Sequence, residues 1–450
     1  MIEAFNYKLN EICNALNSEN FKDNDLVRDI TWDSRDKGKN HCFVCIKGKN
    51  FDGYNFVDQA IENGAGVIIS ERNVDINKPV IIVKSTIQAL LSLAEFHLSN
   101  TKTIIIGVTG SVGKTTTKEM INAVLSSKYR TFCTFENENN EIGVAKTALS
   151  VKDEEFCVIE MGMRGSSEIR ALSKACHPQA SVITNCGSAH IGILGSCENI
   201  FLAKTEILEY TEKYCILPYE QRFVDLKKEN LITTYVGNNS MCVDLYADDI
   251  VMDGNGITYS VFYKGSNKGK IYLPTFSFHN VTNSLNAYAI GLIYGMEHSD
   301  IQKGLRGFSN VALREDNIKI NGITMHLGCY NASFDSMKSA INSFAEYCKV
   351  KKLTPNLLLG KMQELGENED EYHFRIGEYA RDSGIKELIA VGNGSKPYLD
   401  GFCGGLLFES KTDAAKYILE NYRCSDAFLI KGSRVENLEY IINEMEELMK

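Results

Sequence analysis

A glycine-rich segment in the first quarter of the chain combines residue types that suit the binding of an anion. Gly110 and Gly113 let backbone N–H groups approach a phosphate closely, because neither residue carries a side chain. Lys114 adds a mobile cation, and Thr115 adds a hydroxyl group that can bind Mg²⁺. The segment therefore predicts a nucleoside triphosphate site. The residues predicted to contact the nucleotide here are Thr109, Gly110, Ser111, Val112, Gly113, Lys114, Thr115 and Thr116.

The sequence around this loop, which we call the P-loop (residues 107–116), supplies elements that would position it. Residues 104–106 predict a short buried strand, and residues 116–126 predict a helix whose N-terminus faces the glycines. The strict pattern GxxxxGK[ST] has a glycine where this chain has Val108, so the loop is a variant of the commonest form. The alternative, an ordinary glycine-rich turn, is disfavoured by the strand and helix on either side.

Polar side chains follow two further predicted strands. Glu160 comes directly after the apolar run 156–159, and Asn185 and His190 follow the run 181–184. Because ligands of a parallel sheet bind at the carboxyl ends of its strands, we expect Glu160 and His190 beside the phosphates, where each would hold a Mg²⁺ ion. Taken alone, Glu160 could cap a turn and His190 could be an ordinary loop histidine, but their joint placement favours a metal site.

The order of the predicted elements indicates an α/β protein of three domains. Residues 1–98 alternate short strands with helices, and the polar stretch 99–102 marks their end. Residues 99–312 predict a doubly wound parallel sheet that carries the P-loop, with an antiparallel appendage over residues 214–276. Residues 313–450 predict a second, smaller α/β domain with a Rossmann-like order. Helices are predicted over residues 56–63, 87–98, 116–126, 280–294 and 435–450.

Composition and charge exclude several classes of protein. The 450 residues carry 48 basic and 58 acidic side chains, a formal net charge of −10, so nothing favours binding to nucleic acid or to an anionic membrane surface. No apolar run approaches the roughly 18 residues that span a bilayer, and the first residues lack a basic segment followed by an apolar one. We expect a cytoplasmic protein that binds small molecules and has no nucleic-acid or membrane partner.

One cysteine pair has the spacing of a redox or metal site. Cys42 and Cys45 form a CxxC motif beside His41. The stretch 42–46, however, is an apolar β-like run, whereas a redox pair usually opens a helix, and no second CxxC lies at zinc-ribbon spacing. The pair is therefore predicted to be structural, like most of the other cysteines among the 14 in the chain.

Taken together, these motifs resemble the Mur ligase family along nearly the whole chain. The P-loop is similar to the TGxxGKTT of that family, residues 137–144 to its NxNNxIGV, and residues 160–165 to its EMGxRG. Residues 184–206 resemble TNxxxAH followed by AKxE. The other resembling segments are 33–35, 47–48 and 51–56 near the start, and 279–283 (HNxxN), 360–366 (GxMxELG) and 431–434 (KGSR) near the end.

The resemblance implies ATP-dependent amide formation in peptidoglycan precursor synthesis. The N-terminal domain would bind a UDP-linked muramyl tripeptide, whose carboxylate would form an acyl phosphate with ATP. The amine of an acceptor dipeptide, D-Ala-D-Ala, held by the C-terminal domain, would then attack this intermediate. The resemblance also implies Mg²⁺ as a cofactor, and we expect a monomer.

Roles for individual residues follow from the same resemblance. The implied catalytic residues are Lys114, Glu160, His190, Lys204 and Arg314, the last reaching the γ-phosphate when the domains close. The implied metal ligands are Thr115, Glu160, His190 and Lys204; Asn139 and Asn140 are implied near the phosphates and Asn283 near the adenine. Implied substrate-binding residues are Asp33, Ser34, Arg35, Lys47, Gly48, Asp52, Asn331 and Ser333. Lys204 is carbamylated in many family members, which would make it an anionic metal ligand; unmodified, it would contribute a positive charge.

The departures from the family pattern concentrate in the third domain. Where the family has DDCYNANPDS, residues 327–336 have LGCYNASFDS, so two aspartates, an asparagine and a proline are replaced. Lys361 stands where aspartate is usual, Leu313 replaces a glycine, and the usual NxDD is replaced near residues 217–220. The lost carboxylates and the added lysine change the local charge by about three units. Two alternatives therefore remain: a paralogue that joins a different amine or carboxylate, and a catalytically weak nucleotide-binding homologue.

Overall fold

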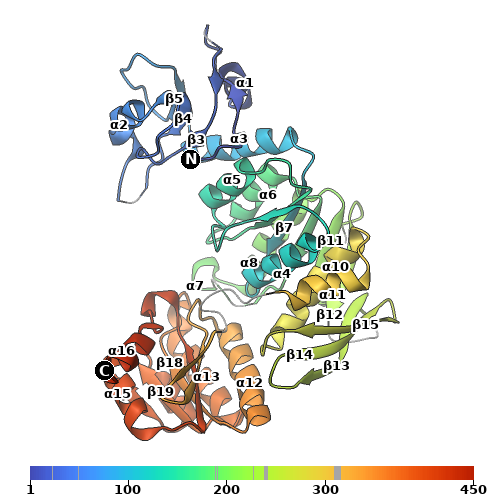
Figure 1. Ribbon diagram of the computed structural model, residues 1–450, viewed down its shortest axis with the longest axis vertical. Coiled ribbons are helices and arrows are strands. Elements are labelled where there is room, and N and C mark those ends of the chain that lie inside the picture. Colours follow the sequence, from blue (N-terminus) through green and yellow to red (C-terminus); the bar gives the residue numbers. More distant parts are fainter. Residues whose placement is uncertain are drawn as a thin grey trace.

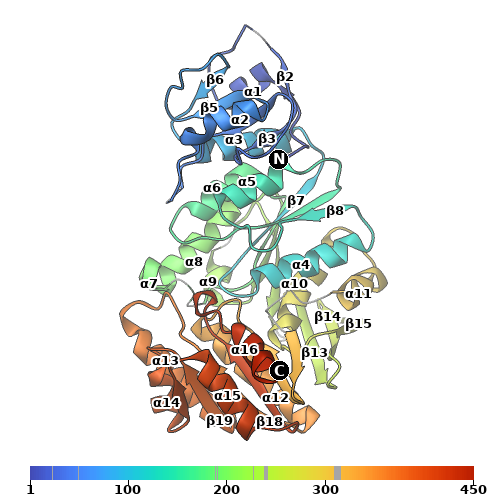
Figure 2. The same cartoon turned by 60° about the vertical axis from the view of Figure 1, so that its left-hand side comes forward.

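Three α/β parts follow one another along the long axis of the molecule, with the N-terminal part at one end and the C-terminal part at the other (Figure 1). A view turned by 60° has the same order (Figure 2). This computed structural model describes residues 1–22, 24–48, 50–187, 189, 191–226, 228–237, 242–308 and 316–450. Among these residues, no helix combines the length and the apolar character needed to cross a membrane.

The N-terminal part is built on a small parallel sheet with the strand order β3-β4-β5-β6. Helix α3 begins after Ser85, whose hydroxyl oxygen accepts a hydrogen bond from Gln88 N and so caps the helix. The buried face of α3 contacts α5 and α6 of the central part, and the three share one apolar core. The elements are β1 (Tyr7–Lys8), α1 (Leu9–Ala15), β2 (Leu26–Val27), β3 (Ile30–Thr31), β4 (His41–Val44), η1 (Gly53–Phe56), α2 (Val57–Glu62), β5 (Ala65–Ser70), β6 (Val80–Ile82) and α3 (Thr86–Ser99).

The CxxC motif lies in and just after a buried strand. Cys42 is within β4, Cys45 directly follows it, and both are buried free thiols. Burial raises the pKa of the Cys45 thiol to about 11 and also raises the pKa of the Cys42 thiol. Both thiols are therefore protonated at neutral pH, which agrees with the predicted structural role.

The central sheet has the strand order β15-β14-β13-β12-β11-β10-β7-β9-β8. Neighbouring strands from β8 to β13 are parallel, whereas β13-β14 and β14-β15 are antiparallel. β7 lies between β9 and β10, so the strand order changes direction beside it, and ligands of such sheets bind at this kind of position. The strands are β7 (Ile104–Thr109), β8 (Thr131–Cys133), β9 (Phe156–Glu160), β10 (Ala180–Ile183), β11 (Tyr214–Pro218), β12 (Ile232–Gly237), β13 (Leu245–Met252), β14 (Ile257–Tyr263) and β15 (Ser266–Leu273).

The predicted antiparallel appendage over residues 214–276 is wrong for its first half. β11 and β12 are parallel to β10 and extend the central sheet. The reason lies in β11, where Ile216 points into one core and Cys215 and Leu217 point into the other. A strand that is apolar on both faces requires cover on both sides, as in the interior of a parallel sheet.

Helices cover both faces of the central sheet (Figure 1). Along β7, Ile106 and Val108 enter the core beneath α4, α10 and α11, while Ile105 enters the core beneath α5, α6 and α8. This alternation follows from the two-residue period of a strand. The helices are α4 (Lys114–Ser126), α5 (Glu141–Leu149), α6 (Glu168–Cys176), α7 (Ile191–Leu194), α8 (Cys197–Thr205), η2 (Glu206–Glu209), α9 (Gln221–Asp225), α10 (His279–Ile293) and α11 (His298–Arg306).

The C-terminal part has a sheet with the order β16-β17-β21-β18-β19-β20, parallel except for the β16-β17 pair. The predicted helix over residues 435–450 is shorter than expected: Asn437 has a left-handed φ of +46°, and the helix begins only at Tyr440. The elements are β16 (Asp316–Ile320), β17 (Ile323–Leu327), α12 (Phe334–Lys351), β18 (Thr354–Leu359), η3 (Gly366–Asn368), α13 (Glu369–Asp382), β19 (Glu387–Val391), α14 (Lys396–Phe402), β20 (Leu406–Phe408), α15 (Lys411–Asn421), β21 (Asp426–Lys431), η4 (Arg434–Glu436) and α16 (Tyr440–Leu448).

Candidate functional site

The P-loop joins β7 to α4 in a conformation that requires its two glycines. Gly110 and Gly113 have φ values of +152° and +85°. A Cβ atom on Gly110 would lie 1.9 Å from Thr184 Oγ1, and one on Gly113 would lie 2.5 Å from Asn283 Oδ1. No ordinary side chain fits at either position, so the backbone N–H groups of the loop stay accessible to a phosphate.

The loop that follows β10 holds the P-loop in this shape. Asn185 accepts a hydrogen bond from Val112 N at 3.0 Å and donates one to Val112 O at 2.8 Å. Thr184 Oγ1 donates to the same carbonyl oxygen at 2.6 Å, and Ser111 Oγ donates to Gly187 O at 3.3 Å. Asn185 follows β10, as predicted, and its contacts hold the P-loop in shape.

Lys114 and two of the predicted metal ligands, Thr115 and Glu160, lie in or beside the P-loop. Lys114 Nζ donates to Gly110 O at 2.8 Å, which places its ammonium group over the loop. Thr115 Oγ1 donates to Glu160 Oε2 at 2.6 Å, and Asn139 Nδ2 donates to Glu160 Oε1 at 2.7 Å. Glu160 is 1% exposed, so its carboxylate is oriented by a hydroxyl on one oxygen and an amide on the other.

This arrangement suits Mg²⁺ bound together with a nucleotide. In the described part of the chain, no group of three or more His, Cys, Asp or Glu residues could hold a metal ion by itself. Mg²⁺ usually takes one or two protein oxygen ligands and completes its octahedron with phosphate oxygens and water. Thr115 and Glu160 supply two such oxygens next to the phosphate loop. His190 and Arg314 lie outside the described residues, so their roles stay predictions.

Lys204 lies beneath the P-loop with 1% of its surface exposed. Its ammonium group donates to Gly110 O at 2.9 Å, the same carbonyl oxygen that Lys114 contacts. Burial, followed by the repulsion of Lys114, lowers the pKa of Lys204 to about 7. A substantial fraction of Lys204 is therefore neutral at physiological pH, and a neutral amine is the form that reacts with CO₂.

Other residues predicted to contact the nucleotide have structural partners. Thr109 Oγ1 donates to Met161 O at 2.8 Å. Asn140 Oδ1 accepts a hydrogen bond from Gly143 N at 3.0 Å and caps α5. Asn283 Nδ2 donates to Asn280 Oδ1 at 2.9 Å, and the amide of Asn283 lies against Gly113 of the P-loop.

A cavity of about 260 Å³ adjoins the P-loop and reaches the C-terminal part. Two carboxylates line it, Glu220 after β11 and Asp335 at the start of α12, and a hydrogen bond of 3.0 Å between His279 Nδ1 and Ser339 Oγ joins the two parts at its wall. None of these four residues is among those predicted individually from the sequence. The lining residues are Val112, Asn185, Cys186, Gly187, Glu220, His279, Asp335 and Ser339.

A second contact joins the central and C-terminal parts through backbone alone. Gly192 N, in α7, donates to Glu364 O at 3.0 Å. A Cβ atom on Gly192 would lie 2.6 Å from Gly366 N and 2.8 Å from Glu364 O. Such distances are too short for any real Cβ, so this close approach requires glycine.

The predicted donor residues lie in two loops of the N-terminal part, one after β3 and one after β4. Arg35 NH2 pairs with Asp33 Oδ2 at 2.6 Å, and this contact lowers the pKa of Asp33 to about 2. Ser34 Oγ donates to Gln59 Oε1 at 2.6 Å. A backbone bridge joins Lys47 to Asp52, the residue that caps η1. Gly48 N donates to Phe51 O at 2.9 Å in the same turn.

The predicted acceptor residues lie before α12, close in sequence to the cavity residue Asp335. Asn331 Oδ1 accepts a hydrogen bond from Ala332 N at 2.8 Å, and Asn331 O accepts one from Lys431 Nζ at 2.8 Å. Ser333 N donates to Ser336 Oγ at 2.9 Å at the first turn of α12. Both predicted residues therefore shape the start of α12.

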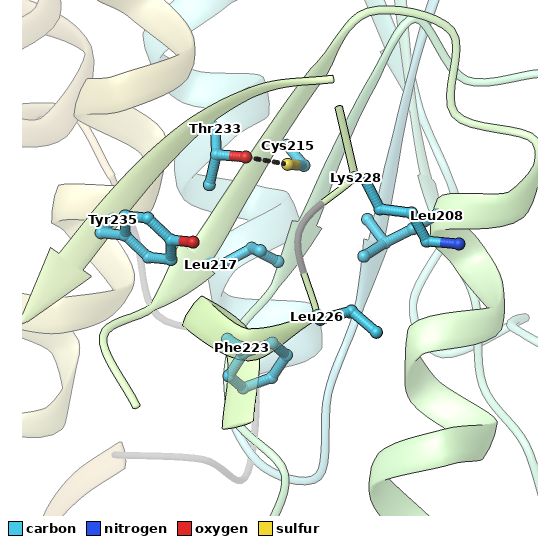
Figure 3. A pocket seen from close by; sticks show the side chains of 8 residues that line it. All are labelled: Leu208, Cys215, Leu217, Phe223, Leu226, Lys228, Thr233 and Tyr235. Atoms are coloured by element: carbon cyan, nitrogen blue, oxygen red, sulfur yellow. Dashed lines mark hydrogen bonds between the residues drawn. The ribbon is translucent and has the colours of Figure 1, made fainter. Parts of the chain in front are cut away.

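A smaller hollow lies between η2, α9 and strands β11 and β12 (Figure 3). Its volume of about 10 Å³ leaves room for one water molecule at most. Cys215 Sγ and Thr233 Oγ1 lie 3.1 Å apart there, and burial raises the pKa of the Cys215 thiol. This hollow is too small to bind any substrate.

Comparison with known proteins gives the same picture as the site. The description "Mur ligase family, catalytic domain" matches residues 27–97, "Mur ligase middle domain" residues 108–291, and "Mur ligase, glutamate ligase domain" residues 314–434. The UDP-N-acetylmuramoyl-tripeptide--D-alanyl-D-alanine ligase of Bacillus subtilis (strain 168) is 34% identical over 436 residues, 94% of this chain and 94% of its own. The chain belongs to the Mur ligase family. The ligase of the same name from Escherichia coli (strain K12) is 30% identical and covers 98% of each chain.

Solved structures of related proteins match the fold of this chain along nearly its whole length. MurF from Acinetobacter baumannii has a TM-score of 0.91 at 27% identity and covers 99% of this chain and 100% of its own. MurF ligase from Thermotoga maritima, solved in complex with ADP, has a TM-score of 0.84 at 25% identity and covers 94% of this chain and 97% of its own. The predicted α/β class and the predicted family are thus confirmed, and the protein is a ligase.

Proposed function

We propose that this ligase joins D-alanyl-D-alanine to a UDP-N-acetylmuramoyl tripeptide and converts ATP to ADP and phosphate. One observation carries the proposal: the P-loop residue Val112 and the α12 residues Asp335 and Ser339 line the same cavity, so a phosphate and an amine from opposite parts can meet there. The names of the relatives from B. subtilis and E. coli support these substrates.

The chemistry needs two anions to approach each other. An oxygen of the donor carboxylate attacks the γ-phosphorus of ATP, ADP leaves, and an acyl phosphate forms. Lys114 offsets the negative charge on the phosphates, while Thr115 and Glu160 would hold Mg²⁺ beside them. Mg²⁺, when bound, supplies positive charge between carboxylate and phosphate. We propose that His190 holds a second Mg²⁺ ion and that Arg314 adds positive charge at the γ-phosphate, as the family resemblance implies.

The second step takes place at the cavity. The acceptor amine attacks the carbonyl carbon of the acyl phosphate, phosphate leaves, and the nitrogen loses a proton. Asp335 puts negative charge on the cavity wall, which attracts an ammonium group before it is deprotonated, whereas Arg222 offsets the charge of Glu220. Arg222 pairs with Glu220 at 2.8 Å and also donates to Cys186 O at 2.9 Å, so it fixes the position of the Glu220 carboxylate.

The domain division belongs to the same proposal. Residues 1–98 would bind the UDP-linked donor, residues 99–312 ATP, and residues 313–450 the acceptor, in a monomer that works in the cytoplasm. Lys204 would take part as a carbamylated metal ligand or as an unmodified cation.

A different acceptor amine is the second candidate. It is motivated by Leu327 and Gly328, which replace two family aspartates, and by Lys361, whose ammonium group pairs with Glu369 at 2.8 Å. This pair neutralises the added lysine locally, so the charge at the acceptor side differs less from the family pattern than the sequence indicates.

Purified protein incubated with UDP-muramyl tripeptide, ATP, Mg²⁺ and D-Ala-D-Ala tests the proposal. We expect phosphate release that requires the dipeptide, and a product whose mass equals donor plus dipeptide minus one water. Turnover with other amines alone would support the second candidate. Nucleotide binding without turnover under any acceptor would contradict both.

A further inference from the structure

A buried lysine outside the proposed reaction steps lies one helical turn after the P-loop lysine. Lys118 follows Lys114 on α4, and its side chain is fully buried. Its ammonium group donates to Thr134 O at 2.6 Å and to Glu136 O at 3.0 Å, and it pairs with the Glu119 carboxylate at 2.7 Å. An ammonium group has three donors, and here each of them has an oxygen partner.

The two carbonyl groups belong to the loop that leads from β8 to α5. Thr134 is buried, and its hydroxyl oxygen accepts a hydrogen bond from Glu160 N at 3.0 Å. Thr134 N donates to Val158 O at 3.0 Å, which continues the pairing of β8 with β9. Five residues further on, Asn139 donates to the Glu160 carboxylate at 2.7 Å. The loop therefore contacts both the backbone and the side chain of Glu160.

This loop does not hold its shape by local preference alone. Glu136 has a left-handed φ of +44°, a conformation that costs energy for a residue with a side chain. Asn140 fixes the far end by capping α5. Lys118 fixes the near end, and its carbonyl partners include the strained residue itself.

We propose that Lys118 is a positioning residue for Glu160: it anchors the loop of residues 134–139, and the loop in turn orients the carboxylate. The inference rests on the proposed role of Glu160 as a ligand of Mg²⁺. An apolar side chain at position 118 would leave the carbonyl groups of Thr134 and Glu136 buried without their donor, and the loop would move to regain partners. Groups that orient a metal ligand typically change metal affinity 10–100-fold when removed.

Binding of a non-hydrolysable ATP analogue, measured by calorimetry with Mg²⁺ and again with EDTA, tests the proposal. We expect Lys118→Met to weaken binding about 10–100-fold in Mg²⁺ and to leave binding in EDTA close to that of the wild type. Lys118→Arg keeps the donors and should recover most of the loss. Lys128→Met, an exposed lysine just after the same helix, is the matched control and should behave as the wild type.

The outcomes separate the inference from the proposed function. Wild-type Mg²⁺ dependence in Lys118→Met, or equal weakening with and without Mg²⁺, would overturn the role of Lys118. If that variant does not fold, Thr134→Val, which removes the hydroxyl contact to Glu160 N, must lose Mg²⁺-dependent binding, and an unchanged dependence would overturn the inference. A wild-type protein whose binding ignores Mg²⁺ would overturn the metal site itself.

Discussion

Replacing Glu160 with glutamine tests the proposed metal site with little change of shape. Glu160 is 1% exposed, and its two oxygens accept hydrogen bonds from Thr115 at 2.6 Å and from Asn139 at 2.7 Å. The glutamine oxygen can still accept from Asn139, and the new amide can donate to the Thr115 hydroxyl oxygen if that hydroxyl group turns. Both contacts therefore survive, and the loss is confined to the negative charge.

The two consequences of this loss differ in size. A hydrogen bond to a charged group contributes about 1 kcal/mol more than a neutral one, so two such bonds lose about 2 kcal/mol of folding free energy. The substitution also removes the free-energy cost of burying a charged carboxylate, and this offsets part of the lost folding free energy. Catalysis loses a ligand of the proposed Mg²⁺ and with it positive charge that offsets the reacting phosphates, and losing one group that stabilises transition-state charge lowers kcat by about 10²–10³-fold, or about 3–4 kcal/mol.

Glu160→Gln should therefore melt close to the wild type and lose turnover. The assay follows phosphate release at saturating substrates over a range of Mg²⁺ concentrations, together with thermal unfolding and binding of the UDP-linked donor. We expect unchanged donor binding, because that site is predicted in the N-terminal part. Turnover within tenfold of the wild type at every Mg²⁺ concentration would refute the assignment of Glu160.

Three further predictions concern Lys114, the contact between the central and C-terminal parts at Gly192, and the buried Lys204. Lys114→Ala should abolish phosphate release and leave donor binding intact, measured by calorimetry, because the proposed ATP and donor sites lie in different parts. Gly192→Ala should slow ligation tenfold or more, measured by phosphate release, because its Cβ would lie 2.6 Å from Gly366 N and hold the parts open. The pKa of unmodified Lys204 falls from 10.5 to about 7, so the unfolded chain binds more protons than the folded one between these pH values. The free energy of unfolding of the wild type should therefore rise from pH 7 towards pH 10 relative to that of Lys204→Met. The expected rise, measured by denaturant unfolding, is up to about 1.4 kcal/mol per pH unit.

Two of these predictions have a matched control variant, and each has a result that would contradict it. For the cation, Lys128→Ala on the surface should keep full turnover, and equal loss of ATP and donor binding in Lys114→Ala would contradict separate sites. For the contact between parts, Gly307→Ala is the matched change, since its Cβ has no neighbour closer than 3.5 Å. Ligation by Gly192→Ala at the wild-type rate would show that this contact is not needed. A stability difference for Lys204 that does not vary with pH would contradict the lowered pKa.

The P-loop and Glu160 could be predicted because the signals are local. Glycines, lysine and threonine sit between a β-branched run and a helix, and a carboxylate that ends one parallel strand lies beside the end of its neighbour. The predicted limits of both elements are too narrow, since β7 extends to Thr109 rather than to residue 106 and α4 begins at Lys114 rather than at residue 116. The predicted roles of the two ends of the chain come from the family resemblance, because the spacing of apolar residues carries no such information.

Residues brought together by tertiary packing could not be predicted in this way. Asp335 and Glu220 line the same cavity although they come from different parts of the chain, and nothing in the sequence around either residue indicates that the two lie close together. In the sequence, Lys118 is an ordinary lysine of a predicted helix. Its burial beside the loop after β8, where it donates to Thr134 O, is visible only in the structure. The parallel pairing of β11 differs from the prediction because the glycine and asparagine turns later in residues 214–276 indicate hairpins for the whole segment. The run of apolar residues in β11 instead favours a strand that is covered on both faces.

The acyl phosphate is the central claim, and oxygen transfer tests it most directly. The donor is prepared with ¹⁸O in both oxygens of its reacting carboxylate and is incubated with the protein, unlabelled ATP, Mg²⁺ and D-Ala-D-Ala, and the released phosphate is analysed by mass spectrometry. Attack of the carboxylate on the γ-phosphate predicts one ¹⁸O atom in each phosphate released and one in each amide product. Phosphate that carries no ¹⁸O while the amide forms would contradict the account.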